Sequence, residues 1–213
     1  MTKPVIIVNF AYKSPTGQGY GKGPGALRTM LRYFQYRDRR NNWLAKNRGY
    51  IRWIDRGMGK HHREIFRQCE ALQSDHVMAW MFVVSPAPDL MTLVPERQRR
   101  AFISELTERV VEDYYTARGL DRPEFSYTIH TAKTQATETE PSREHLHTHV
   151  VLPGTVSSMV ERLPVYNNAS KGHDKLFREI AAHHFSTMLD QTIGVEWRRL
   201  RDDPEHAPDR SIT

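Results

Sequence analysis

The sequence predicts an α+β fold, in which helices pack on a mainly antiparallel sheet. Strand-like apolar stretches alternate with helix-like stretches over most of the 213 residues, and two strands then follow each other directly. The connector between those two strands, residues 131–144, is polar and shows no apolar periodicity. Because parallel neighbours need a crossover, usually a helix, a purely parallel sheet is disfavoured.

The first expected elements are a strand, a loop and a helix. A continuous apolar run begins at Val5 and predicts a buried strand over residues 5–10. Residues 14–25 are rich in glycine and polar side chains, a composition that favours a loop. Apolar residues then recur at helical spacing and predict a short helix over residues 25–36.

Two strands and a helix are expected next. Residues 51–54 form a short strand-like stretch, and residues 77–84 form a strongly apolar one that Pro86 and Pro88 would end. Between them, residues 60–72 carry apolar side chains at helical spacing.

The second half of the chain contains the two consecutive strands between two helices. Proline is favoured in a first helical turn, so Pro95 predicts the start of a long helix that ends near Gly119. The consecutive strands are residues 125–130 and 147–152, and a last amphipathic helix covers residues 176–189.

The chain length and composition predict one domain. A chain of this size can bury one substantial core, which we assign to residues 1–200. Residues 201–213 are polar and contain prolines, so we expect a disordered tail there. The first residues lack the pattern of a signal peptide, and no apolar run is long enough to span a bilayer. We therefore expect a cytoplasmic protein.

Charge points to a polyanionic partner. The formal net charge is +6, the sequence pI is about 9.5, and arginines cluster at residues 37–40 and 97–100. The planar guanidinium group suits phosphate and stacks on bases, so nucleic acid is the natural partner. Charge alone fits a merely solvated basic surface equally well. The single cysteine, Cys69, stands among apolar helix positions and is expected to pack there.

Three histidines in the consecutive strands are the strongest candidate ligands. Alternation places His147 and His149 on one face of their strand, about 7 Å apart, and His130 ends the preceding strand. Three imidazoles with open positions suit Zn, Mn, Fe, Ni or Co, so they indicate a metal site without naming the metal. His145 precedes the apolar run and is expected on the loop.

Chance pairing is the alternative, because the chain has eleven histidines. The adjacent pairs at residues 61–62 and 183–184 lie on helix-like stretches and are read as ordinary surface or packing residues.

The nucleophile that best fits a metal-assisted reaction is a tyrosine. The chain has neither a Gly-x-Ser-x-Gly elbow nor the Gly-Lys-Ser/Thr ending of a P-loop. Tyr33 and Tyr36 lie near the end of the first helix and are flanked by arginines. A tyrosine can attack a metal-polarised phosphodiester and keep the cut strand as a phosphotyrosine ester. An amphipathic helix with half-buried aromatic residues explains these tyrosines equally well at this level.

Four short motifs, taken in order, resemble the HUH-type relaxases, which nick DNA for plasmid mobilisation and conjugation. The motifs are Arg32-Tyr33-Phe34-Gln35-Tyr36-Arg37, Ser85-Pro86-Ala87-Pro88-Asp89-Leu90, Tyr127-Thr128-Ile129-His130 and His147-Thr148-His149-Val150-Val151. The resemblance extends over roughly residues 5 to 190. Each motif is individually weak, and their order carries the specificity.

The resemblance implies a five-stranded sheet and a role for each site residue. Tyr33 would be the nucleophile, with Tyr36 as the alternative. His130, His147 and His149 would bind Mg²⁺ or Mn²⁺, with Zn²⁺ or Ni²⁺ as possible substitutes in vitro. Asp89 would orient a ligand or accept the tyrosine proton.

The implied substrate is single-stranded DNA at an origin of transfer, nicked through a covalent 5′-phosphotyrosine intermediate that allows rejoining. Accessory relaxosome proteins and a conjugative coupling protein are the implied partners. Tyr20 and Trp43 are candidates for stacking on bases. The residues expected to contact the DNA backbone are Arg32, Arg37, Arg39, Arg40 and Lys22.

The chain departs from the family pattern at several points. Thr148 stands between the paired histidines in place of a large apolar residue, and Asp89 stands where relatives use glutamate. The connector at residues 131–144 is longer than usual, and His145 offers a competing ligand if the register slips.

Three other functions remain open from the sequence. A rolling-circle replication initiator or a transposase of the same superfamily would place its tyrosine after the histidine pair, where Tyr166 is the candidate. A metal-dependent phosphodiesterase would use water and form no adduct. A non-catalytic basic DNA-binding module would need only the charge.

Overall fold

The computed structural model describes residues 4–17, 22–41, 53–133, 144–156, 163–164 and 172–202. Its strands are β1 (Ile6–Lys13), β2 (Ile54–Arg56), β3 (Ala79–Pro86), β4 (Phe125–Lys133), β5 (Glu144–Pro153), β6 (Thr155–Val156) and β7 (Leu163–Pro164). Its helices are α1 (Pro24–Asn41), α2 (His62–Ala71), α3 (Pro88–Leu93), α4 (Glu96–Thr116), α5 (His173–Ile193) and α6 (Trp197–Asp202).

The main sheet has five strands in the order β1-β3-β5-β4-β2, and every neighbouring pair is antiparallel. This confirms both the predicted α+β class and the five strands that the family resemblance implies. The two histidine-bearing strands, β4 and β5, are consecutive in the chain and adjacent in the sheet. A separate two-stranded sheet pairs β6 with β7.

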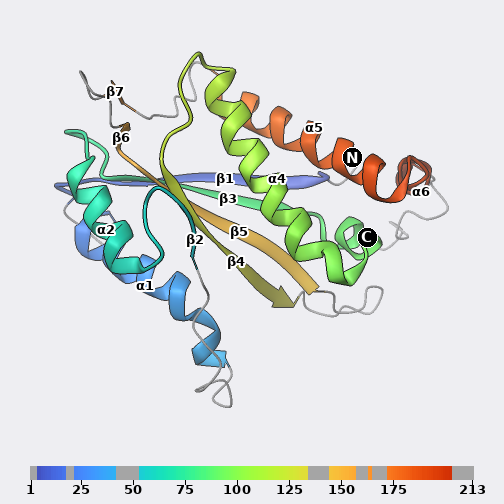
Figure 1. Ribbon diagram of the computed structural model, residues 1–213, viewed down its shortest axis with the longest axis horizontal. Helices are drawn as coiled ribbons and strands as arrows, with labels where there is room; N and C mark the ends of the chain where they lie inside the picture. Colours follow the sequence, from blue (N-terminus) through green and yellow to red (C-terminus); the bar gives the residue numbers. More distant parts are fainter. Residues whose placement is uncertain are drawn as a thin grey trace, which may run out of the picture.

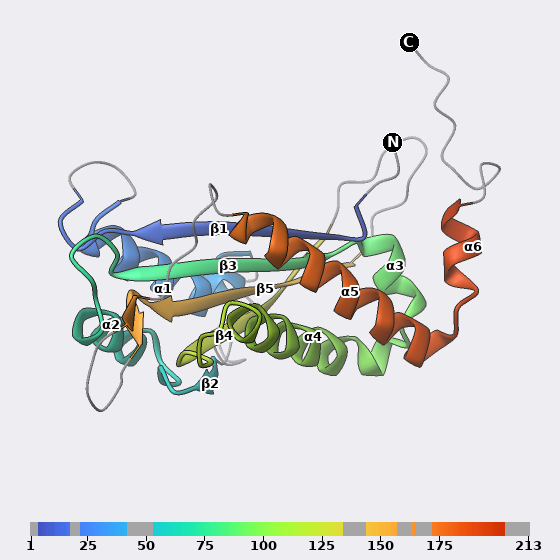
Figure 2. The same ribbon diagram turned by 90° about the horizontal axis from the view of Figure 1, so that it is seen from above.

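Helices cover both faces of the sheet (Figures 1 and 2). The helices α4 and α5 pack against each other on one face, over a core that includes Phe82, Tyr127 and Val150. On the other face α1 and α2 pack against each other over a smaller cluster that includes Met81 and Val151. No helix in the described part of the chain is long and apolar enough to cross a membrane.

Several elements differ from those expected. The helix α1 continues to Asn41, beyond its expected end. The strand β1 continues to Lys13, because it pairs along its whole length with β3. The strand β3 includes Pro86 as its last residue. A proline is tolerated at the end of a strand, because the N–H that it lacks is not needed to continue the backbone hydrogen bonds of the sheet. The short helices α3 and α6 and the β6–β7 pair were not expected. The expected tail, residues 201–213, lies outside the described residues except for the end of α6.

Thr148, the departure within the histidine pair, has a structural role on the opposite face of the sheet. Its side chain is fully buried, and its hydroxyl lies 2.9 Å from Thr107 Oγ1 of α4. Thr107 already donates to the carbonyl oxygen of Ile103, so Thr148 is the donor in this pair. A threonine therefore ties β5 to α4 where an apolar residue would only pack.

We expect Thr148→Val to lower the free energy of unfolding by about 1 kcal/mol, because it removes one buried hydrogen bond while keeping the side-chain shape. Urea denaturation at neutral pH measures the change. The control is Thr116→Val at an exposed position of α4, which should leave stability within roughly 0.5 kcal/mol of the wild type. Equal stability of the Thr148 variant and the wild type would contradict the assigned bond.

Candidate metal centre

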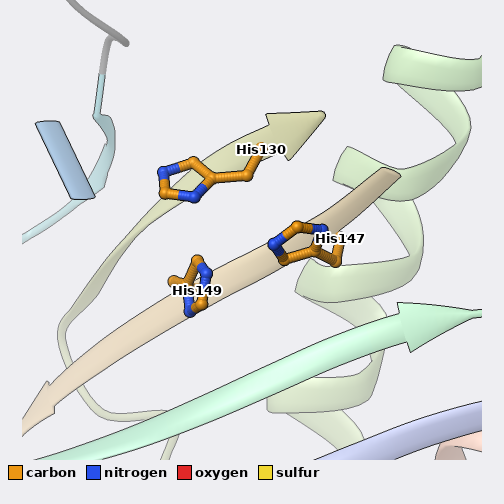
Figure 3. A group of neighbouring side chains, drawn as sticks. All are labelled: His130, His147 and His149. Carbon is orange, nitrogen blue, oxygen red and sulfur yellow. The ribbon is translucent and has the colours of Figure 1, made fainter. Parts of the chain in front are cut away.

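The register of β4 and β5 brings three histidines together. His130 is paired directly with His147 across the two strands, and His149 lies two residues further along β5 on the same face. One ring nitrogen from each side chain lies within 4.8 Å of the others. Figure 3 shows the three rings projecting from one side of the two strands, with α4 behind them.

Alternation along β5 explains why this face is polar. Leu146, Val150 and Leu152 point into the core under α4 and α5, so the residues between them must face α1. Two of the three histidines are nevertheless closed to bulk solvent: His130 is fully buried and His147 is 8% exposed, while His149 is half-buried. A polar cluster this deep needs partners that satisfy its nitrogen atoms.

The helix α1 supplies one such partner. Nε2 of His130 lies 2.8 Å from the carbonyl oxygen of Phe34, and a carbonyl can only accept, so Nε2 carries the proton. In the neutral ring, which is the form that binds metal, Nδ1 of His130 then holds the lone pair that a metal would take. Metal-binding histidines commonly donate their other ring N–H to a backbone carbonyl in this way, which fixes the tautomer.

Phe34 also forms an aromatic wall of the cluster. Its ring stacks on His149, with ring centroids 4.1 Å apart and an angle of 18° between the planes. Thr128 faces His149 across the strand pair and is fully buried. Within the described residues its hydroxyl has no hydrogen-bond partner. The cluster therefore includes a buried polar oxygen that a bound ion or its water could satisfy.

The donor set fits a divalent cation. It consists of three imidazoles, which bind metal in their neutral form, and contains no carboxylate, so a bound ion would keep its full positive charge toward an anionic substrate. Three protein ligands leave positions open for substrate, as catalytic metal sites do.

His145 lies on β5 and not on a loop, so that expectation was wrong. The strand begins at Glu144, because the ladder with β4 extends to the pair formed by Lys133 and Glu144. His145 faces the same side as the other histidines, and its Nε2 lies 2.7 Å from Ser85 Oγ. Burial lowers the pKa of His145. Its ring lies 5.2 Å from that of His147, but the group whose ligand nitrogens lie within 4.8 Å of one another consists of His130, His147 and His149.

The candidate tyrosines lie on α1, beside the residue that contacts the histidines. Tyr33 is 40% exposed, and its ring centroid is 6.1 Å from that of Phe34. The ring of Tyr36 packs edge-on to His62 of α2, with centroids 5.6 Å apart. Asp89 is exposed in the first turn of α3, which contacts β5. The catalytic roles of these residues remain predictions.

The expected DNA-contacting residues fall into two groups. Lys22 and Arg32 are exposed, respectively just before α1 and on it. The backbone of Arg37, Arg39 and Arg40 continues α1, but their side chains lie outside the described residues. Tyr20, Trp43 and Tyr166 lie outside the described residues as well.

Comparison with solved structures identifies the architecture. A copper-bound structure of the conjugative relaxase TrwC in complex with oriT DNA aligns with a TM-score of 0.53 and 12% identity, over 87% of this chain and 70% of that chain. The fold is that of a conjugative relaxase. A TrwC structure complexed with a 27-mer DNA, which comprises the recognition hairpin and the cleavage site, aligns at a TM-score of 0.49 and 9% identity, over 87% and 69%. No family model matches the sequence, and no curated protein is similar to it at a significant level.

Within this relaxase fold, the structure adds a buried pair that the sequence did not reveal. The backbone N–H and Nδ1 of His62 both lie 2.8 Å from Oε1 of Gln35, a fully buried residue of α1. An amide oxygen only accepts, so Nδ1 of His62 carries a proton. Burial, followed by the nearby charges of His61, Arg63 and Arg32, lowers the pKa of His62 to about 4. The pair fixes α2 against α1.

The lowered pKa predicts a pH-dependent contribution to stability. An unfolded chain protonates His62 near pH 6.5, before the folded chain does, so stability is fully present above that pH and falls as the pH drops toward 4. The loss approaches ~3 kcal/mol at pH 4. Urea denaturation between pH 7 and pH 4.5 should show a smaller loss for His62→Gln than for the wild type. His76→Gln, at an exposed position, should follow the wild type, and equal pH profiles for all three proteins would refute the assignment.

Proposed function

We propose that this protein is a metal-dependent, strand-specific DNA nickase, a relaxase that cleaves single-stranded DNA at an origin of transfer. The observation that carries the proposal is the group of His130, His147 and His149 within 4.8 Å, facing a helix that bears two tyrosines. The relaxase fold supports it. The contact of Phe34, the neighbour of Tyr33 on α1, with the ring of His149 supports it as well.

Helix geometry favours Tyr33 over Tyr36 as the nucleophile. Phe34 is the residue of α1 that stacks on the histidines. At 3.6 residues per turn, Tyr33 lies about 100° around the helix from Phe34, whereas Tyr36 lies about 200° away. Tyr36 is moreover packed against His62 of α2. Tyr33 can reach the region beside the histidines by a side-chain rotation, while Tyr36 faces the other way.

The reaction is a transesterification. Tyr33 Oη attacks the scissile phosphorus, the bond from phosphorus to the 3′ oxygen breaks, and the 5′ phosphate stays on Tyr33. A divalent cation bound by the three imidazoles, Mg²⁺ or Mn²⁺, supplies Lewis-acid stabilisation of the phosphate oxygens. The phenolic proton passes to a base, for which Asp89 is our candidate, and the leaving 3′ oxygen takes up a proton. Attack by a 3′-hydroxyl on the phosphotyrosine reverses the step and rejoins the strand.

Arginines and Phe34 support this chemistry. Arg32 neighbours Tyr33 and is exposed, so its guanidinium can pair with a phosphate beside the attacking oxygen. Phe34 holds the ring of His149 and, through its carbonyl, orients His130. Accessory relaxosome proteins and a coupling protein are the partners that this function requires.

Covalent adduct formation tests the proposal. The wild type and its variants are incubated with Mn²⁺ and a randomised single-stranded DNA library, and adducts are separated on denaturing gels and mapped by peptide mass spectrometry. We expect adducts with the wild type and Tyr36→Phe, and a loss of at least about 100-fold with Tyr33→Phe. Adducts that survive the loss of Tyr33 and map to Tyr166 would favour a replication initiator or transposase. Cleavage without any adduct would favour a water-dependent phosphodiesterase.

Metal binding is tested separately by calorimetric titration with Mn²⁺. The wild type should bind one ion, and His147→Ala/His149→Ala should lose that binding because two of the three ligands are gone. The matched control is His76→Ala/His183→Ala, which removes two exposed histidines and should bind like the wild type. If the ligand variant and the wild type bind alike, the histidines do not form the site.

A further inference from the structure

A groove lined by several cationic side chains runs between α1 and α2. The proposed nicking reaction uses only some of these side chains. One carboxylate, Glu70, stands among the residues that line the groove. The cationic residues that line it are Lys13, Arg28, Arg32, Arg63 and Arg67. Arg63 and Arg67 on α2 have no part in the nicking step.

The arginines of the groove come in two like-charged pairs. Arg28 and Arg32 are four residues apart on α1, and Arg63 and Arg67 are four residues apart on α2. Side chains at this spacing are neighbours on a helix, where like charges repel. Within the described residues none of the four forms an ion pair with a carboxylate. Four guanidinium groups without carboxylate partners in one groove indicate an anionic ligand with several charges in a row.

Aromatic rings in the same groove narrow the choice of ligand. Tyr33 and Tyr36 line it beside the arginines. Phe66 of α2 is buried, and the guanidinium of Arg28 already covers its ring, 4.3 Å from the ring centre. Basic side chains with aromatic rings between them are typical of sites for single-stranded nucleic acid, whose unpaired bases can stack on the rings. Bases in a duplex are stacked on one another and offer no free face. Gly25, which also lines the groove, has open space where a side chain would begin, so a strand can approach the backbone closely there.

We propose that the α1–α2 groove binds a segment of single-stranded DNA, with its phosphates on the two arginine pairs. The choice of DNA rests on the proposed function; the binding of a single-stranded polyanion does not. Tyr33 lines this groove and also neighbours Phe34, which covers the histidines. The groove therefore leads a bound strand to the tyrosine from the side of α2.

The salt dependence of binding tests this assignment without any nicking. A fluorescently labelled oligothymidylate is titrated with each protein in EDTA at several salt concentrations, and the slope of log K against log salt is compared. Each phosphate contact in a single strand contributes about 0.7 to this slope, so Arg63→Gln/Arg67→Gln should reduce it by about 1.4. Arg28→Gln/Arg32→Gln on α1 should give a similar reduction.

The matched control is Arg97→Gln/Arg100→Gln, which removes the same charge from exposed positions of α4 on the opposite face of the sheet. It should leave the slope unchanged. An unchanged slope for the α2 variant, or an equal reduction for the α4 variant, would overturn the proposal. Competition by duplex DNA as strong as by single-stranded DNA would also overturn it. Because the assay contains no divalent cation, it can succeed or fail independently of adduct formation.

Discussion

The antiparallel register of β4 and β5 is the constraint on which the rest of the site depends. It sets His130 opposite His147 and leaves His149 two residues further on the same face. A slip of one residue would turn both β5 histidines into the apolar core and bring Thr148 to the site. The buried hydroxyl pair between Thr148 and Thr107 opposes that slip, because it can form only in the observed register.

The two faces of the sheet have different roles. Its α4 face carries the larger apolar core, while the α1 face carries the histidines, the neighbouring Ser85 and Thr128, and a smaller apolar cluster. Phe34 links α1 to the histidines in two ways. Its ring packs on the ring of His149, and its carbonyl oxygen accepts a hydrogen bond from His130. A helix that must carry a nucleophile is thus held in place by contacts to the metal ligands themselves.

Much of this arrangement could be predicted from the sequence. Because side chains alternate along a strand, the sequence predicted that His147 and His149 share a face. A polar connector predicted that their strand is an antiparallel neighbour of the strand of His130. Helical spacing also predicted that Phe34 is buried. Its partner could not be predicted, because periodicity gives the buried face of a helix but not what that face covers.

Other contacts depend on tertiary packing and left no signal in the sequence. The pair of Gln35 and His62 joins residues 27 positions apart, and each looks like an ordinary helix residue in isolation. His145 was misplaced because its apolar neighbours begin only at Leu146, whereas ladder bonds to β4 extend the strand to Glu144. The helical spacing of the two arginines on α2 can be seen in the sequence. That they line the same groove as the arginines of α1 can be known only from the fold.

Anomalous scattering from crystals soaked in Mn²⁺ would show directly whether the three histidines bind a metal. We expect one strong peak within bonding distance of ring nitrogens from His130, His147 and His149. Nδ1 should be the ligand atom of His130, while Nε2 keeps its hydrogen bond to the Phe34 carbonyl. A peak bound by carboxylates elsewhere, or none at the histidines at saturating Mn²⁺, would contradict it.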